Sequence, residues 1–159
     1  MVDLRRTRLL NEQPVLPQAP VVYWMQRDMR VQDNWALLYA AECAEAAQKP
    51  LFVVFNLVQQ FSGATLRQFD FMLKGLAEVE AELRALGIPF YLLRGNPVET
   101  IPAFVQEHQI GHVVTDFNPL RFTNAWRTEV AKCLTIRMTE VDAHNVVPAW
   151  IASPKLEFA

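Results

Sequence analysis

The sequence contains little glycine, with five residues in 159, and none of the five belongs to a GxGxxG or GxxxxGK[ST] pattern. Those patterns allow a backbone turn to approach the phosphates of NAD or of a nucleoside triphosphate. A GxSxG turn, which carries the serine nucleophile of α/β-hydrolases, is also missing. These absences argue against all three kinds of site, and a stand-alone nucleotide-binding module is the weakest functional alternative.

Cysteine and histidine are also scarce. Cys43 and Cys133 lie far apart in segments that predict helices, and neither belongs to a CxxC motif or a Cys/His cluster. We expect both to be reduced, buried thiols of a cytoplasmic protein. The three histidines, His108, His112 and His144, lack the spacing of metal ligands, so we expect no metal site.

An excess of positive charge is missing as well, because 15 lysines and arginines against 17 aspartates and glutamates give a net charge of −2. Binding to DNA or RNA requires a basic surface, so we expect no nucleic-acid binding by this chain alone. Apolar runs are far shorter than the roughly 20 residues of a membrane span, and no secretory signal opens the sequence. Residues 1–20, rich in arginine and containing three prolines, predict an arm or linker before the fold.

The sequence does contain an alternation of strand-like and helix-like segments. There are five strand-like runs, and the first four are mostly continuous, which is typical of strands buried on both faces of a parallel sheet. The five runs occupy residues 21–25, 51–57, 88–93, 112–117 and 139–143. Helical patterns fill the intervals, and this order predicts an α/β domain with helices on both faces of the sheet.

Cap signals mark where the predicted helices begin. Thr65 and Gln68 have the spacing of a capping box, and Gly87 fits the position after the last turn of the same helix. The segments 96–99 (NPVE) and 118–121 (NPLR) each place an asparagine N-cap before a proline at the first helical position. The first helix is expected to start from a cap at residue 33 or 34 and to pack through Trp35, Leu38, Ala41 and Ala46.

In doubly wound sheets, ligands bind beyond the carboxyl ends of the strands, where the strand order reverses. The order 3-2-1-4-5 places this point between the first and fourth strands, and the flavodoxin-like order 2-1-3-4-5 places it between the first and third. In both, residues 26–34 border the crevice; in the first, residues 116–121 form the opposite wall. Both loops precede helix N-termini, whose free N–H groups favour anions.

The charged residues near this crevice have two interpretations. Arg27, Asp28, Arg30 and Asp33 are favoured as internal salt bridges that brace the strand-to-helix joint. The functional alternative is that one or two of them contact a ligand or another domain. The DAH segment at 142–144 is favoured as a hydrogen-bonded structural element over a catalytic pair, because no serine or cysteine nucleophile is near it.

Four motifs suggest a family. They are YWMQRDMRVQDNWALL (23–38), RQFDFMLKGLAEVE (67–80), TDFNPLR (115–121) and VDAHNVVPAW (141–150). In this order and spacing they resemble the N-terminal α/β domain of class II cyclobutane-pyrimidine-dimer DNA photolyases. The resemblance implies a domain at 21–147 with a five-stranded parallel sheet in the order 3-2-1-4-5, and places the start of an interdomain linker at 148–159.

The resemblance also implies a function. Members of the family are flavoproteins that use light to split pyrimidine dimers in UV-damaged DNA, which makes the parent enzyme a carbon–carbon lyase. Their N-terminal domain can hold an antenna chromophore such as a deazaflavin, whereas FAD and the DNA groove belong to a helical C-terminal domain. The chain should therefore neither bind FAD or DNA nor catalyse repair by itself.

Our candidates for residues that line the antenna crevice are Arg27, Asp28, Asn56, Asp116, Phe117 and Arg121, none with a catalytic role. Arginines favour an anionic group and phenylalanine favours a planar ring. The alternative is a purely structural scaffold with an empty crevice. In that case Trp150 and Phe158, on a strap to the missing domain, would face solvent and promote self-association.

Overall fold

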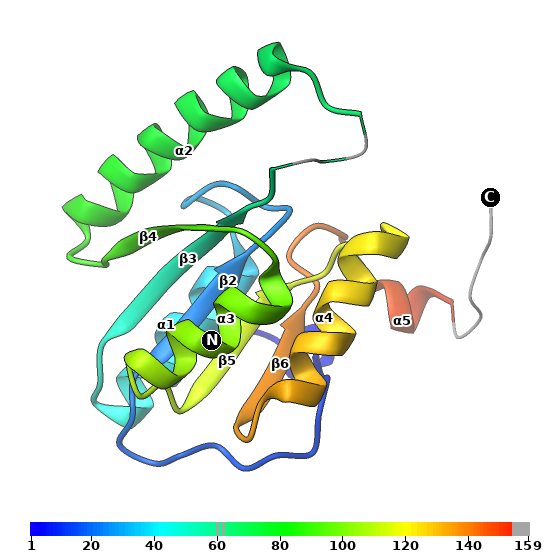
Figure 1. The fold of residues 1–159 in the computed structure, drawn as a ribbon. Helices are drawn as coiled ribbons and strands as arrows, with labels where there is room; N and C mark the ends of the chain where they lie inside the picture. The colour runs from blue at the N-terminus through cyan, green and yellow to red at the C-terminus, as the bar shows by residue number, and fades with distance from the viewer. Residues whose placement is uncertain (60, 62, 154–159) are drawn as a thin grey trace.

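The computed structural model describes residues 1–59, 61 and 63–153, and Figure 1 shows their arrangement. The strands are β1 (Thr7–Leu9), β2 (Val21–Met25), β3 (Leu51–Leu57), β4 (Phe90–Arg94), β5 (His112–Asp116) and β6 (Arg137–Val141). The helices are η1 (Leu4–Arg6, a 3-10 turn), α1 (Trp35–Ala47), α2 (Leu66–Ala85), α3 (Pro97–Glu107), α4 (Arg121–Cys133) and α5 (Ala149–Ala152).

The sheet has six strands in the order β1-β6-β5-β2-β3-β4 and is mixed. The prediction of five strands in an all-parallel sheet is therefore wrong in strand count, and the sixth strand changes the overall order, although the five predicted strands keep the relative order 3-2-1-4-5 when counted from β4. The extra strand is β1, which pairs antiparallel with β6 and comes from the segment that we expected to be an arm. The other five strands are parallel neighbours. These five strands could be predicted from their apolar runs. In contrast, β1 has only three residues and lies in a polar segment, so its pattern is too weak to predict a strand.

Two hydrophobic layers cover the parallel strands, because side chains alternate between the faces of each strand. One core joins Tyr23 and Val53 to α1 and α2, and the other joins Trp24 and Val54 to α3 and α4. Figure 1 shows α3 and α4 in front of the sheet and α1 behind it. The expected helices on both faces are confirmed, and all five residues of β2 are buried between them.

The buried residues of helix α2 lie in its C-terminal half. Leu76, Val79 and Leu83 are buried, whereas Leu66 and Phe71 near its start are 86% and 81% exposed. In Figure 1 the first turns of α2 stand away from the sheet. The regular apolar spacing from residue 66 onward correctly predicted the helix, but spacing alone cannot say where along a helix the packing partner ends.

The caps of α2 and α3 confirm their predictions, because the Thr65–Gln68 capping box forms and Asn96 caps α3 with Pro97 in its first turn. Helix α4 begins later than predicted. Asn118 is not its N-cap; instead its Oδ1 accepts a hydrogen bond from the backbone N–H of Leu120 (3.1 Å) in the preceding turn. The predicted start was therefore wrong by two residues, about half a turn.

Helix α1 starts after Asn34, whose Oδ1 accepts from two backbone N–H groups of the first turn. Its buried residues are Ala36, Leu37, Ala40 and Ala44. The predicted inward face was therefore wrong, and Trp35 is 40% exposed. The Arg6 guanidinium lies over its ring, 5.1 Å from the centroid, which explains how an aromatic side chain is accommodated on the outer face.

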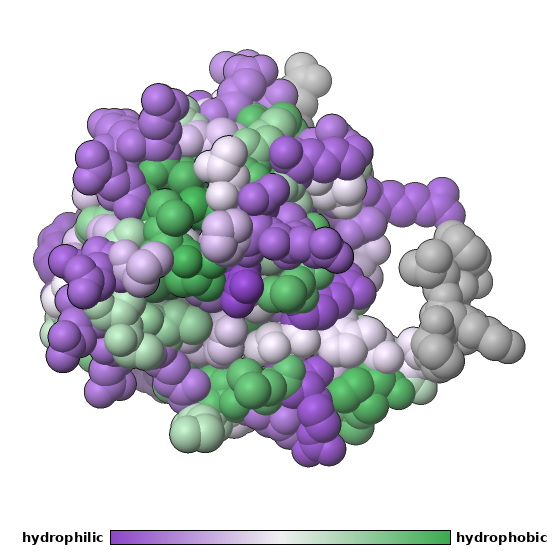
Figure 2. Space-filling view, turned by 90° about the horizontal axis from the view of Figure 1, so that it is seen from below, coloured by the Kyte–Doolittle hydropathy of each residue, from purple (hydrophilic) through white to green (hydrophobic). Residues whose placement is uncertain are grey.

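The cysteine prediction is confirmed in part. Both thiols are free, but Cys43 is half-buried and Cys133 is exposed. Figure 2 shows that hydrophobic residues form separate patches among hydrophilic ones on the face seen from below. Among the described residues, no helix is long and apolar enough to cross a membrane, and no group of three or more His, Cys, Asp or Glu side chains is placed to hold a metal ion.

Candidate functional site

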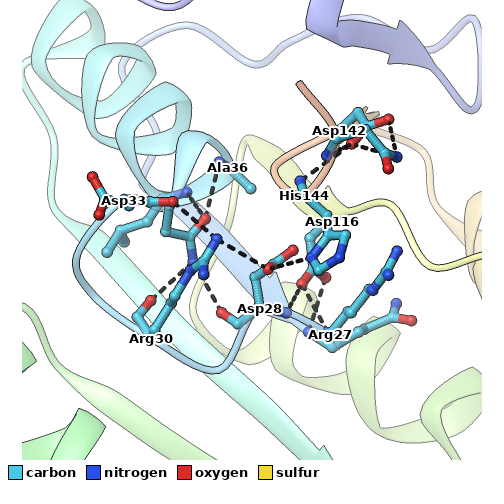
Figure 3. A network of polar contacts seen from close by, with 12 residues as sticks. Arg27, Asp28, Arg30, Asp33, Ala36, Asp116, Asp142 and His144 are labelled. Carbon is cyan, nitrogen blue, oxygen red and sulfur yellow. Dashed lines mark hydrogen bonds and ion pairs between the residues drawn. The ribbon is translucent and has the colours of Figure 1, made fainter. Parts of the chain in front are cut away.

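Asp116, the last residue of β5, fixes the loop that follows β2. Its side chain is completely buried, and the two strands are parallel neighbours, so their carboxyl ends meet. Oδ1 accepts a hydrogen bond from the N–H of Gln26 (2.9 Å), and Oδ2 accepts from Arg27 (2.8 Å) and Asp28 (2.7 Å). Figure 3 shows these bonds converging on one carboxylate. Three backbone donors thus hold the start of the loop in a single conformation.

Burial raises the pKa of Asp116 to about 6. The three N–H donors stabilise the ionised carboxylate and offset part of this effect, whereas the nearby negative charge of Asp28 adds to it. The pKa of Tyr23 is raised well above its ordinary value, mainly because its side chain is completely buried and secondly because Asp116 carries a negative charge nearby. The base of the crevice is therefore a low-dielectric region that disfavours additional negative charge.

Asp28 lies between a guanidinium group and an imidazole ring at the edge of this region (Figure 3). Its Oδ1 is 3.4 Å from the guanidinium of Arg30 and 3.4 Å from Nδ1 of His144. Its Oδ2 is buried without a hydrogen-bond partner among the described residues. Arg30 also donates to the backbone carbonyl of Asp33 (3.2 Å). These contacts support the bracing interpretation of the joint.

Asp142 has a structural role, as the sequence favoured. Its carboxylate accepts hydrogen bonds from the backbone N–H groups of His144 (3.2 Å), Asn145 (2.9 Å) and Ala149 (2.8 Å), and from the Asn145 side chain. Burial raises the pKa of Asp142, but these hydrogen bonds lower it by more, so that it lies below its ordinary value. The DAH segment therefore shapes the entry to α5, which supports its structural interpretation.

A buried ion pair lies behind the crevice and was missed by the sequence analysis. Nε of Arg127 on α4 is 2.8 Å from Oε1 of Glu140 on β6, and the two side chains are 1% and 0% exposed. Arg8 of β1 contacts the other carboxylate oxygen. Two signals were available: Glu140 interrupts a buried strand, and Arg127 occupies a position of the buried face of α4.

A cavity opens at the carboxyl ends of β2 and β3, with a volume of about 150 Å³. Its walls are mainly apolar and aromatic, and none of the described residues that line it is charged. The aromatic walls are Trp24, Phe55, Phe61, Phe69 and Trp126, and three carboxamides (Gln26, Asn56 and Asn118) supply the polar contacts.

Of the six predicted crevice residues, the structure places Asn56 in the wall of this cavity. Asp28 and Asp116 lie in the buried network beside it, and Arg27 contributes a backbone N–H to that network. The two others lie elsewhere. Phe117 packs edge-to-face on Trp150 (5.9 Å between centroids), and Arg121 is exposed at the first turn of α4.

The cavity suits a planar, uncharged ring. Aromatic walls favour stacking, and the carboxamides supply orienting hydrogen bonds. Ligand pockets usually enclose roughly 300–1,000 Å³, so a volume of about 150 Å³ encloses only part of a molecule as large as a deazaflavin. The remainder of such a molecule would extend through the mouth of the cavity.

Comparison with known proteins decides the family. A family model described as DNA photolyase matches residues 21–157. The chain belongs to the DNA photolyase family. The match covers the five parallel strands, the cavity and α5 but not β1, so the family is shared across most of the described α/β fold rather than through one short motif.

Individual relatives agree with this assignment. The chain is 49% identical to the deoxyribodipyrimidine photo-lyase of Potorous tridactylus over 158 residues, which are 97% of this chain and 30% of that protein. It is 51% identical to the Arabidopsis thaliana enzyme of the same name over 142 residues, 88% of this chain and 29% of that protein. Cryptochrome-1 of Mus musculus is 26% identical over 123 residues, 76% of this chain and 20% of that protein. The chain thus spans less than a third of the length of these relatives.

Proposed function

We propose that the chain is the N-terminal domain of a class II photolyase, a light-driven lyase that splits cyclobutane pyrimidine dimers in UV-damaged DNA. The observation that carries the proposal is the family match over residues 21–157, together with 49% and 51% identity to two proteins named deoxyribodipyrimidine photo-lyase. The lower identity to cryptochrome-1, 26%, supports the choice of a photo-lyase over a cryptochrome.

Within such an enzyme, the domain has the role of holding an antenna chromophore of the deazaflavin type. An antenna absorbs light and passes the excitation to FAD, which belongs to the part of the parent enzyme outside this chain. The protein's contribution is then to orient the ring and to exclude water. The aromatic walls of the cavity and its lack of charged lining residues support this role. Of the predicted residues, Asn56 is the one that we propose contacts the chromophore.

A second role, that of a scaffold for a catalytic domain with no chromophore of its own, is favoured by the small volume of the cavity. In this case the exposed start of α2 would lie at the domain interface. The self-association that we expected from Trp150 has less support, because its Nε1 donates to the carbonyl of Arg5 (2.9 Å) and its ring packs on Phe117. Phe158 lies outside the described residues.

Titration with 8-hydroxy-5-deazariboflavin distinguishes the two roles. If the domain holds an antenna, the bound chromophore leaves water for an aromatic site, so its visible absorption band should shift and its fluorescence should change. Saturable binding with a dissociation constant of tens of micromolar or below supports the antenna (about −6 kcal/mol or stronger). The same titration without any spectral change would leave the scaffold as the function of the domain.

A further inference from the structure

The carboxamide of Gln26 is held in one orientation by two neighbours. The hydroxyl of Thr115 donates to the carbonyl of Trp24 (2.9 Å), so its oxygen is left to accept from Nε2 of Gln26 (3.2 Å). At the other end, Nη1 of Arg127 lies 3.4 Å from Oε1 of Gln26, and a guanidinium can only donate. Both contacts require the same assignment of nitrogen and oxygen, which leaves one N–H of Gln26 for a ligand.

The other two carboxamides of the cavity have the same polarity. Oδ1 of Asn118 accepts from the N–H of Leu120 (3.1 Å), and Oδ1 of Asn56 accepts from the hydroxyl of Thr100. Nδ2 of Asn56 donates one of its two hydrogens to the carbonyl of Gly95 (2.8 Å). Protein donors therefore occupy the oxygens of all three carboxamides, and each retains at least one unused N–H.

Arg127 organises this arrangement from outside the cavity. Its Nη2 donates to the backbone carbonyl of Asn118 (2.7 Å), its Nη1 contacts Gln26, and its Nε faces Glu140. One buried guanidinium thus holds two residues of the cavity wall. Lysine could not make these three contacts, because its ammonium group is a single point charge without a planar fork.

The enclosed volume sets the size of the group that can be taken in. A dry apolar cavity of about 150 Å³ holds one benzene ring, and the cavity here has the same volume. A charged group would be costly to bury there, because no lining residue among the described ones carries a compensating charge. The wall therefore fits a single uncharged six-membered ring that offers hydrogen-bond acceptors.

We propose that the cavity recognises the carbonyl edge of an uncharged six-membered ring through the N–H groups of Gln26, Asn56 and Asn118, and that Arg127 is a positioning residue that keeps Gln26 in its donor orientation. This proposal rests on the antenna function, because the carbonyl-bearing ring of a deazaflavin is one source of such an edge. A pyrimidine base is another source with the same chemistry.

Three probes separate these sources. 8-Hydroxy-5-deazariboflavin carries the carbonyl-bearing ring in a tricycle, thymidine carries a similar ring alone, and acridine is a tricycle of similar shape without carbonyl groups. The wild-type protein should bind the deazaflavin about tenfold or more tightly than acridine, since each unmatched buried donor costs about 1–3 kcal/mol. Competition by thymidine would show that the single ring is sufficient, and its failure to compete would assign the ligand to the tricyclic class.

Two variants test the roles of individual residues. Gln26→Glu keeps the shape of the side chain but replaces its N–H donor with an acceptor, so affinity for the deazaflavin should fall about tenfold while affinity for acridine changes little. Arg127→Lys keeps the positive charge beside Glu140 but removes the contact that orients the Gln26 carboxamide. The ratio of the affinities for the deazaflavin and for acridine should therefore become smaller. Gln106→Glu, on the exposed side of α3, is the matched control and should behave as the wild type.

The ratio of the two affinities separates positioning from mere structural support. Substitution of a residue that only stabilises the fold would weaken the binding of both probes alike. Thermal unfolding of each variant measures any loss of stability. Equal losses for both probes in Gln26→Glu and Arg127→Lys would overturn the proposal and leave the antenna function standing. A wild-type protein that binds neither the deazaflavin nor thymidine would overturn both.

Discussion

Asp116 shows how one buried side chain can organise a site without touching its ligand. The carboxylate is buried away from water, and it accepts three hydrogen bonds from backbone N–H groups instead. One comes from each of the first three residues after β2. Buried polar groups are tolerated only when such partners are present. The wall of the cavity at Gln26 and Met29 therefore depends on a residue of the neighbouring strand.

Replacing Asp116 with asparagine should destabilise the protein by about 2–4 kcal/mol, because an NH₂ group would face backbone N–H donors that have lost their acceptor. Urea-induced unfolding at pH 7 measures this loss. A variant as stable as the wild type would show that the loop after β2 does not depend on the carboxylate.

The raised pKa of Asp116 also predicts how the stability difference between the wild type and this asparagine variant depends on pH. The pKa of Asp116 in the folded protein, about 6, lies above its ordinary value of 3.8. Between these pH values the folded state binds a proton that the unfolded state lacks, so this group adds stability as the pH falls from 7 toward 4. The asparagine variant cannot titrate at this position. The difference in unfolding free energy between wild type and variant should therefore be larger at pH 5 than at pH 7.

The candidate residues show what sequence can and cannot predict at this scale. Asn56 was placed in the crevice because it lies at the carboxyl end of a buried strand, and it lines the cavity. Phe117 follows a strand equally closely, but its ring turns toward Arg8 and Trp150, both far from it in the sequence. Strand order predicts which loops meet; the side on which each side chain lies depends on contacts that no local pattern contains.

At the scale of elements, the strands were predicted more accurately than the helix faces. The limits of β2 and β3 match their predictions, because buried parallel strands form continuous apolar runs with sharp ends. Helix α1 is apolar on nearly every side, so its pattern could not indicate which face is inward. The ion pair of Arg127 and Glu140 was missed because its partners, on α4 and β6, become neighbours only when the sheet is assembled.

Two glycines provide a matched test of how the elements pack. A Cβ added at Gly75, within α2, would meet no atom within 4 Å, whereas one at Gly111 would lie 2.6 Å from Cβ of Ala19 and 2.6 Å from the carbonyl oxygen of Leu16. Gly75→Ala should therefore raise the unfolding free energy by about 0.5–1 kcal/mol through helix propensity.

Gly111→Ala should lower the unfolding free energy by about 1–3 kcal/mol, because the chain before β2 must move away from β5. Chemical denaturation of both variants under identical conditions measures the two effects. The structure would be contradicted in this region if both substitutions changed stability in the same direction.

At the scale of the whole molecule, the first ten residues join the two ends of the described chain. The guanidinium of Arg6 donates to the carbonyls of Asn145 (2.7 Å) and Val146 (2.8 Å), just before α5. Arg8 contacts Glu140 and lies over the ring of Trp150, 4.7 Å from its centroid. The segment 1–20, predicted as an arm or linker, therefore includes residues that pack against the last strand and helix.

Substitution of Arg8 tests this connection. Arg8→Ala should lower the unfolding free energy by about 1–3 kcal/mol, because Glu140 is fully buried and would keep only one cationic partner; the effect is reduced by the 42% exposure of Arg8. Arg5→Ala is the control. Its exposed pair with Asp3 should contribute little to the free energy of unfolding, because solvent screens the two charges. Urea unfolding that gives equal losses for the two variants would argue against a stabilising role of the Arg8 contact.

The short strand β1 also bears on aggregation. It occupies the edge of β6, a strand whose residues 138–141 are buried. Without β1, β6 would present unpaired backbone N–H and C=O groups, and such an edge is a template for strands of other molecules. Removal of Thr7–Leu9 should therefore expose the edge of β6 to pairing with strands of other molecules.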